Sequence, residues 1–117
     1  MTESIIGRLR DAVEESGARF TLLIIPDAIQ VYPELWDHAL RNHKAADRER
    51  LDPQLPLQKI AEMVARLEVE HIDLYPAIRE YRERTGGRLY FDRAHFNLDG
   101  HKLVSEVILK HLASTED

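Results

Sequence analysis

One uninterrupted apolar run, Phe20 to Ile25, limits what this chain can fold into more than any other segment. The run is rich in branched side chains, shows no alternation of apolar and polar residues, and ends abruptly at Pro26 and Asp27. A strand of this kind is typical of parallel sheets, because helices cover both faces of such a sheet and bury every side chain. The run therefore predicts a buried parallel strand.

A second short strand and several amphipathic helices are expected around this run. The second strand is predicted at residues 71 to 75, a helix is expected to start at Pro76, and residues 88 to 91 form a short extended run. Apolar residues at helical spacing predict the other helices. They are Ile5, Ile6, Leu9 and Val13; Leu35, Trp36, Ala39 and Leu40 after Pro33; Leu57, Ile60, Ala61, Met63, Val64 and Leu67; and Leu103, Val104, Val107, Ile108 and Leu112.

This alternation of helices and strands predicts an α/β fold. We expect three layers, α/β/α, around a small parallel sheet with right-handed crossovers. At 117 residues the chain is predicted to be a single domain, residues 1 to 117.

The composition is that of an ordinary globular chain, with 44% hydrophobic and 32% charged residues. The net charge is −5 and the basic residues are interleaved with acidic ones, so no nucleic-acid partner is expected. The absence of cysteine excludes disulfides and thiolate chemistry. No segment reaches transmembrane length and the first ten residues do not form an export signal. The chain as it stands is therefore expected in the cytoplasm, while the compartment of a longer parent protein, export included, is left open.

The stretch from Tyr90 to His101 carries the candidate chemistry. Asp92 and His95 lie three residues apart in what should be a tight turn. At that spacing the carboxylate can accept a hydrogen bond from the imidazole, which fixes the tautomer and leaves the far ring nitrogen free as a general base. Asn97 is expected to cap the last helix, with Asp99 in its first turn.

This string, D-x-x-H-x-N-x-x-G-H from Asp92 to His101, resembles the last block of the SGNH/GDSL hydrolases. In that family the D-x-x-H supplies the acid and base of a Ser-His-Asp triad, just before the C-terminal helix. The resemblance implies that His95 is the general base and Asp92 its orienting acid, with no cofactor. It also implies the C-terminal half of a flavodoxin-like SGNH fold, whose ligands bind beyond the carboxyl ends of the strands. Asp27 would lie near that edge too, as a turn residue rather than a catalytic one.

The nucleophile of such a triad is missing from this chain. None of the serines stands in the family's Gly-Asp-Ser context, and the glycine and asparagine of its oxyanion hole have no counterparts. The resemblance thus implies the C-terminal portion of a serine esterase, acyl hydrolase or acyltransferase that is inactive alone. Its substrate would be an ester-linked acyl group on a small molecule or carbohydrate, with an O-acetyl group as one option. The serines are Ser4, Ser16, Ser105 and Ser114.

If the strands of the SGNH fold that precede this portion are absent, the run from Phe20 to Ile25 has an unpaired edge and uncovered apolar faces. Such an edge is a template for association. We therefore expect a homo-oligomer that pairs or covers this strand.

Two other interpretations stay open. Asp92, His95, Asp99 and His101 could ligate zinc or manganese, although they form no H-E-x-x-H or H-x-H arrangement. Alternatively, the chain is a non-enzymatic interaction module whose partner surface combines the mixed-charge segment, residues 42 to 52, with Trp36. Tyr32, Trp36 and the irregular segment of residues 26 to 56 could instead form a lid over an acyl pocket. The remaining histidines are expected at the surface: His38, His43, His71 and His111.

Overall fold

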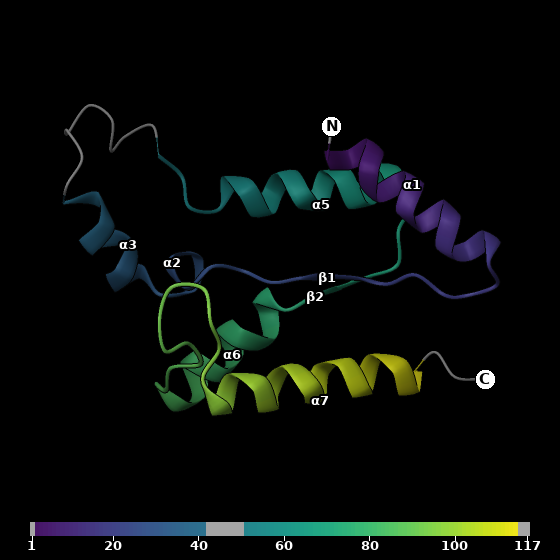
Figure 1. Cartoon of the computed structure of the whole chain (residues 1–117). Coiled ribbons are helices and arrows are strands. Elements are labelled where there is room, and N and C mark those ends of the chain that lie inside the picture. Colours follow the sequence, from purple (N-terminus) through teal and green to yellow (C-terminus); the bar gives the residue numbers. More distant parts are fainter. Residues whose placement is uncertain (1, 42–50, 115–117) are drawn as a thin grey trace.

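The computed structural model describes residues 2–41 and 51–114, so the charged segment before residue 51, with His43, lies outside the described residues. The two strands pair in parallel, with Leu23 opposite Ile72. The mixed helix and strand class predicted from the sequence is confirmed. The elements follow the order α1 (Thr2–Glu15), β1 (Leu22–Ile24), α2 (Ala28–Val31), α3 (Pro33–Leu40), α5 (Leu55–Leu67), β2 (His71–Asp73), α6 (Tyr75–Thr85) and α7 (Leu98–Ser114) (Figure 1).

Helices lie on both faces of the strand pair (Figure 1). On the face of α1 and α5, Ile24 forms a buried cluster with Met63 and Val64. On the opposite face, Ile72 joins a larger buried cluster that includes Ile78 of α6 and Leu89, and α7 packs against it. Leu23 packs against this larger cluster too, so Leu23 and Ile24, which are neighbours along β1, point to opposite faces. Both faces accept apolar side chains because each has its own helix layer.

The strands are shorter than predicted. β1 covers only half of the run from Phe20 to Ile25, and Ile25 is 51% exposed. β1 has a hydrogen-bonded neighbour on one side only, so the sheet cannot bury the whole run. The predicted extended run at residues 88 to 91 forms no strand and contributes one isolated bridge, between Tyr90 and Phe96.

The first helix buries less than its pattern predicts. Ile6 and Gly7 of α1 face α5, whereas Ile5 and Leu9 are 59% and 52% exposed. The prediction that these two side chains belong to a buried stripe is wrong, because no element of the described chain covers them. None of the described helices combines the length and the apolar content needed to cross a bilayer.

The short helix α2 was not predicted, although the sequence contains its capping signal. The Asp27 carboxylate accepts a hydrogen bond from the Ile29 amide (3.0 Å), and the Gln30 side-chain oxygen accepts one from the Asp27 amide (2.7 Å). This reciprocal arrangement is a capping box. The prediction that Asp27 is a turn residue is confirmed. Pro56 lies in the first turn of α5.

The described fold is extended for its size. The radius of gyration is 16.6 Å, against roughly 13.4 Å for a compact domain of this length. The accessible surface is 8373 Å², against roughly 6,600 Å² for a compact monomer of this mass. A two-stranded parallel sheet therefore leaves much surface uncovered.

Glu70, directly before β2, forms hydrogen bonds with the residues that lead into β1. Its carboxylate accepts hydrogen bonds from Arg19 Nε (2.8 and 2.9 Å) and from the Thr21 hydroxyl, and its carbonyl accepts one from the Leu22 amide (2.9 Å). The Arg19 bonds, followed by the Thr21 bond, lower the pKa of Glu70 from 4.5 to about 2. Glu70 thus joins the segment entering β1 to the segment entering β2.

We expect Glu70→Gln to destabilise the fold by about 1 kcal/mol at neutral pH. The expected loss is small because the Glu70 side chain is one-third exposed and solvent screens its interaction with Arg19. The folded pKa lies below the ordinary one, so the stabilisation is present above pH 4.5 and is lost as the pH falls towards 2. Urea unfolding of both proteins at neutral and acidic pH measures the difference. The matched control is Glu83→Gln, which breaks only the exposed pair with Arg79. An equal loss for both variants, or a loss that persists near pH 2, would contradict the assignment.

Candidate catalytic dyad

Asp92 and His95 form a hydrogen-bonded pair. The Asp92 Oδ2 and His95 Nδ1 atoms are 2.7 Å apart. Because an ionised carboxylate only accepts hydrogen bonds, Nδ1 carries the shared proton, and in the neutral imidazole Nε2 then keeps its lone pair. Nε2 has no hydrogen-bond partner among the residues that the structure describes. The two side chains predicted to form the site are therefore together, in the orientation that a general base requires.

The local turn holds the carboxylate in place. Its other oxygen, Oδ1, accepts hydrogen bonds from the amides of Ala94 (2.8 Å) and His95 (2.7 Å). These backbone bonds, and then the His95 ring, hold the pKa of Asp92 below its ordinary value of 3.8. Asp92 is thus ionised at neutral pH and can stabilise an imidazolium.

The ring of Phe91 lies against the His95 imidazole. The two rings are stacked, with centroids 5.6 Å apart and an interplanar angle of 19°. The Phe91 amide also donates to the His95 carbonyl (3.1 Å), which closes the turn. Sequence reasoning did not identify Phe91, and nothing in its spacing could have done so. The His95 side chain is 70% exposed, so the pair opens to solvent rather than into a closed cleft.

Three contacts attach this turn to the end of β1. The Arg93 carbonyl accepts a hydrogen bond from the Ala28 amide (3.0 Å), and Arg93 Nε lies 3.8 Å from the Asp27 carboxylate. The Tyr90 hydroxyl donates to the Pro26 carbonyl (2.6 Å), and burial raises the pKa of Tyr90 above its usual range. The turn therefore lies at the carboxyl end of β1, beside Asp27, as predicted for the site.

The first turn of α7 is held against the same segment. Asn97 Oδ1 accepts a hydrogen bond from the Gly100 amide (2.9 Å), so Asn97 is the N-cap predicted from the sequence. Its own amide donates to the Leu89 carbonyl (2.8 Å), and its side chain donates to the Arg88 carbonyl (2.8 Å). The cap thus connects α7 to the segment that leads into the dyad.

No serine completes a triad within the described residues. Ser16, Ser105 and Ser114 each donate their hydroxyl to a carbonyl three residues earlier, and Ser4 lies in α1. His101 is exposed, and its ring meets the edge of Phe96. Among the described residues no three His, Asp or Glu side chains are grouped closely enough to hold a metal ion.

Two other side chains are less exposed than the sequence suggests. Tyr32, considered for a lid, is 1% exposed and belongs to the core. His111, expected at the surface, is partly buried, and its Nε2 lies 3.4 Å from a Glu70 carboxylate oxygen. His38 and His71 are exposed, as predicted.

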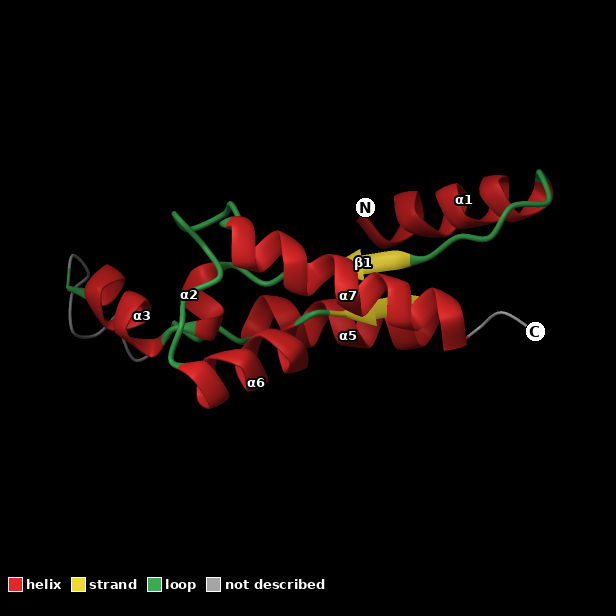
Figure 2. Cartoon of the chain, turned by 90° about the horizontal axis from the view of Figure 1, so that it is seen from below, coloured by secondary structure: helices red, strands yellow, loops and turns green. Residues whose placement is uncertain are grey.

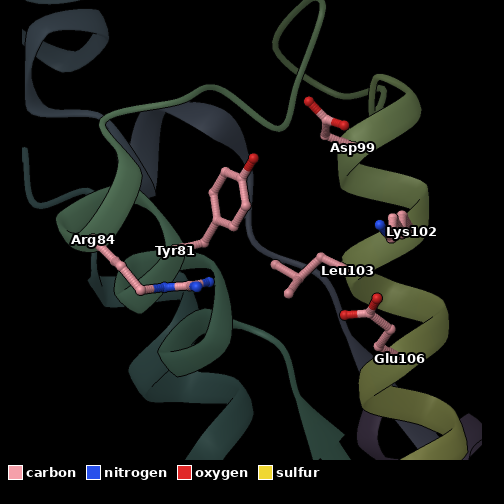
Figure 3. A pocket seen from close by; sticks show the side chains of 6 residues that line it. All are labelled: Tyr81, Arg84, Asp99, Lys102, Leu103 and Glu106. Atoms are coloured by element: carbon pink, nitrogen blue, oxygen red, sulfur yellow. The ribbon is translucent and has the colours of Figure 1, made fainter.

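The chain also carries shallow hollows. One of about 220 Å³ lies between α6 and α7, and neither Asp92 nor His95 lines it. Figure 3 shows that its walls combine cationic and anionic side chains, so it favours no single ligand charge. The lining residues are Tyr81, Arg84, Asp99, Lys102, Leu103 and Glu106.

A second hollow, of about 250 Å³, lies beside the dyad turn. Asp27 and Arg93 line it on the side of the turn, and Ile29, Trp36 and Pro53 line it elsewhere. Trp36 is half-buried, as expected for a packing residue on an amphipathic helix. Of the two aromatic side chains considered for a lid, only Trp36 borders this hollow.

Comparisons of this sequence with known proteins found no matching protein family, no matching curated protein and no matching solved structure.

Proposed function

We propose that this chain is the C-terminal part of an SGNH-type serine esterase, acyl hydrolase or acyltransferase. The single observation that carries the proposal is the 2.7 Å contact between Asp92 Oδ2 and His95 Nδ1, with Nε2 left without a described partner. The position of this pair at the carboxyl end of a parallel strand, directly before the last helix, supports a partial flavodoxin-like SGNH fold.

In the proposed reaction, His95 Nε2 removes the proton from a serine hydroxyl supplied by another part of the enzyme. The serine oxygen attacks the ester carbonyl, and Asp92 stabilises the imidazolium that forms. His95 then returns the proton to the leaving alkoxide. Water or an acceptor hydroxyl, activated in the same way, releases the acyl group. The substrate class is an ester-linked acyl group, with an O-acetyl group on a carbohydrate as one member.

The chain by itself is proposed to be inactive. An acyl-enzyme needs a serine within reach of His95, and the developing oxyanion needs hydrogen-bond donors. In the SGNH family both come from sequence blocks that this sequence does not contain. A non-enzymatic interaction module is the alternative function.

The test is to read the coding DNA on the 5′ side of the Met1 codon, and in adjacent reading frames, for a Gly-Asp-Ser block. The longer or combined protein is then assayed with p-nitrophenyl acetate. We expect turnover that falls roughly 10³- to 10⁴-fold in His95→Ala and in Asp92→Asn. His38→Ala, an exposed histidine on α3, is the matched control and should retain activity.

The chain of 117 residues is assayed in parallel. We expect no turnover beyond that of free imidazole at the same concentration. Turnover by this chain that disappears in His95→Ala would show that it is complete as an enzyme. If no nucleophile-bearing segment is encoded nearby, or if the longer protein keeps its activity without His95, the interaction-module alternative is favoured instead.

A further inference from the structure

The outer edge of β1 carries unpaired backbone groups. The Leu22 amide donates to the Glu70 carbonyl, and the Ile24 carbonyl accepts from the Leu74 amide (3.2 Å), so these strand residues direct their backbone groups towards β2. Backbone groups alternate in direction along a strand, so those of Thr21, Leu23 and Ile25 point the other way. On that side the described chain offers them no partner strand.

Nothing in the sequence of this edge opposes pairing with another strand. Natural edge strands are usually protected by a charged side chain, a proline or a bulge. Thr21 to Ile25 contains no charged residue and no proline. Pro26 follows the run, but the backbone groups at this position point towards β2. The amide hydrogen that proline lacks would therefore not have been available at the outer edge. The edge is therefore open to pairing over its whole length.

Helix α1 lies over the place that a further strand would occupy. Figure 2 shows α1 on the β1 side of the strand pair, outside the sheet. It carries Ile5 and Leu9, one turn apart and both more than half exposed, and Ile25 at the end of the strand is similarly exposed. A strand added to β1 would lie beneath this helix, where its side chains could cover apolar residues that no described element now covers.

The uncovered area matches a stable interface. The accessible surface of 8373 Å² exceeds that of a compact monomer by roughly 1,800 Å². Obligate homodimers bury 2,000–5,000 Å² in total, or about 1,000–2,500 Å² from each chain. The excess, which is counted over the whole surface of the chain and not at this edge alone, is about what one chain contributes to such an interface.

We propose that a second copy of this chain occupies the edge, with the two β1 strands antiparallel around a two-fold axis at Leu23. In this register Leu23 pairs with the partner's Leu23, and Thr21 pairs with the partner's Ile25. The outward backbone groups of these residues are those that an antiparallel hydrogen-bonded pair uses. The result is a four-stranded sheet in which neither β1 edge is free.

The test combines light scattering with amide hydrogen exchange on the wild-type chain. We expect the mass of a dimer at concentrations where the chain is folded. The amides of Thr21, Leu23 and Ile25 should be protected in the dimer and lose that protection on dilution. Ile25→Lys places a charge at the interface on a side chain that is half exposed in the single chain. We expect this variant to be monomeric and folded, as judged by circular dichroism.

Leu109→Lys is the matched control, because it makes the same change at a 65% exposed position on α7 rather than on the edge of β1. It should leave the dimer intact. A monomeric wild-type chain would overturn the proposal, even with those amides protected, because another segment of the same chain would then cover the edge. A dimer with unprotected amides, or one broken by Leu109→Lys and not by Ile25→Lys, would place the interface elsewhere and also overturn it. These measurements use the chain of 117 residues and no esterase assay, so their outcome is separate from that of the catalytic proposal. In the longer enzyme of that proposal, the preceding strands would occupy this edge in place of a second copy.

Discussion

Gly100→Ala is expected to destabilise the protein by about 2–3 kcal/mol, although the same change in an exposed helix interior usually stabilises by up to about 1 kcal/mol. A Cβ atom at Gly100 would lie 2.2 Å from the Leu89 carbonyl oxygen and 2.8 Å from Phe96. The first atom belongs to the backbone and also accepts the Asn97 amide, so α7 would have to move and weaken its own cap. Thermal unfolding should show a melting temperature lower by roughly 10 °C.

Gly7→Ala is the matched control for this change. Gly7 is also a buried glycine within a helix, but its added Cβ would meet only Leu67 Cδ2, at an ordinary 3.5 Å. We expect Gly7→Ala to be neutral or stabilising by up to about 1 kcal/mol. If Gly100→Ala also raised the melting temperature, the close approach of α7 to Leu89 would be refuted. The glycine of the D-x-x-H-x-N-x-x-G-H string thus has a packing role beside the dyad rather than a chemical one.

Tyr32→Ala is expected to cost about 3–5 kcal/mol, and Tyr32→Phe about 1–3 kcal/mol. The ring is buried in the main core, edge-on to Tyr90 at 6.0 Å, so its removal leaves a cavity. The hydroxyl accepts the buried Leu89 amide (2.9 Å), which Tyr32→Phe leaves without that acceptor. Equilibrium unfolding in urea measures both losses.

Tyr81→Phe is the control for loss of a tyrosine hydroxyl. Tyr81 is half-buried, and within the described chain its hydroxyl makes no hydrogen bond. We expect a change of less than about 0.5 kcal/mol. A loss as large as that of Tyr32→Phe, or no loss in Tyr32→Phe, would show that the Leu89 contact does not stabilise the core. Because Leu89 precedes the dyad turn, Tyr32→Phe should also increase amide exchange at residues 89 to 97.

Local features of the sequence were sufficient to predict most of the dyad. Asp92 and His95 are three residues apart, and a tight turn brings a carboxylate and an imidazole together at that spacing without help from distant residues. The same holds for the Asn97 cap, which bonds within its own turn. Pro33 likewise marks the start of α3, because its fixed φ suits the first turn of a helix. Such interactions depend on neighbours in the chain, so the order of residues predicts them.

Contacts between distant segments could not be predicted in this way. The sequence around Tyr32 is compatible with a side chain that covers a pocket and with one that lies in the core. Its contact with Leu89, 57 residues away, shows that it lies in the core. Ile5 and Leu9 continue an apolar stripe that predicts burial, yet they are exposed because nothing described covers them. An apolar stripe on a helix indicates which side chains favour burial. They are buried only if another element packs against that stripe.

The sequence by itself determined the mixed helix and strand class, the parallel character of the β1 run and the pairing of Asp92 with His95. Each follows from side-chain periodicity or from geometry within one turn. The tertiary structure decided that the dyad turn lies against Pro26, Asp27 and Ala28, and that Gly100 must lack a side chain. It also decided that β1 has only one neighbour. These features depend on which segments meet in space, and burial and backbone hydrogen bonding across the whole chain select that arrangement.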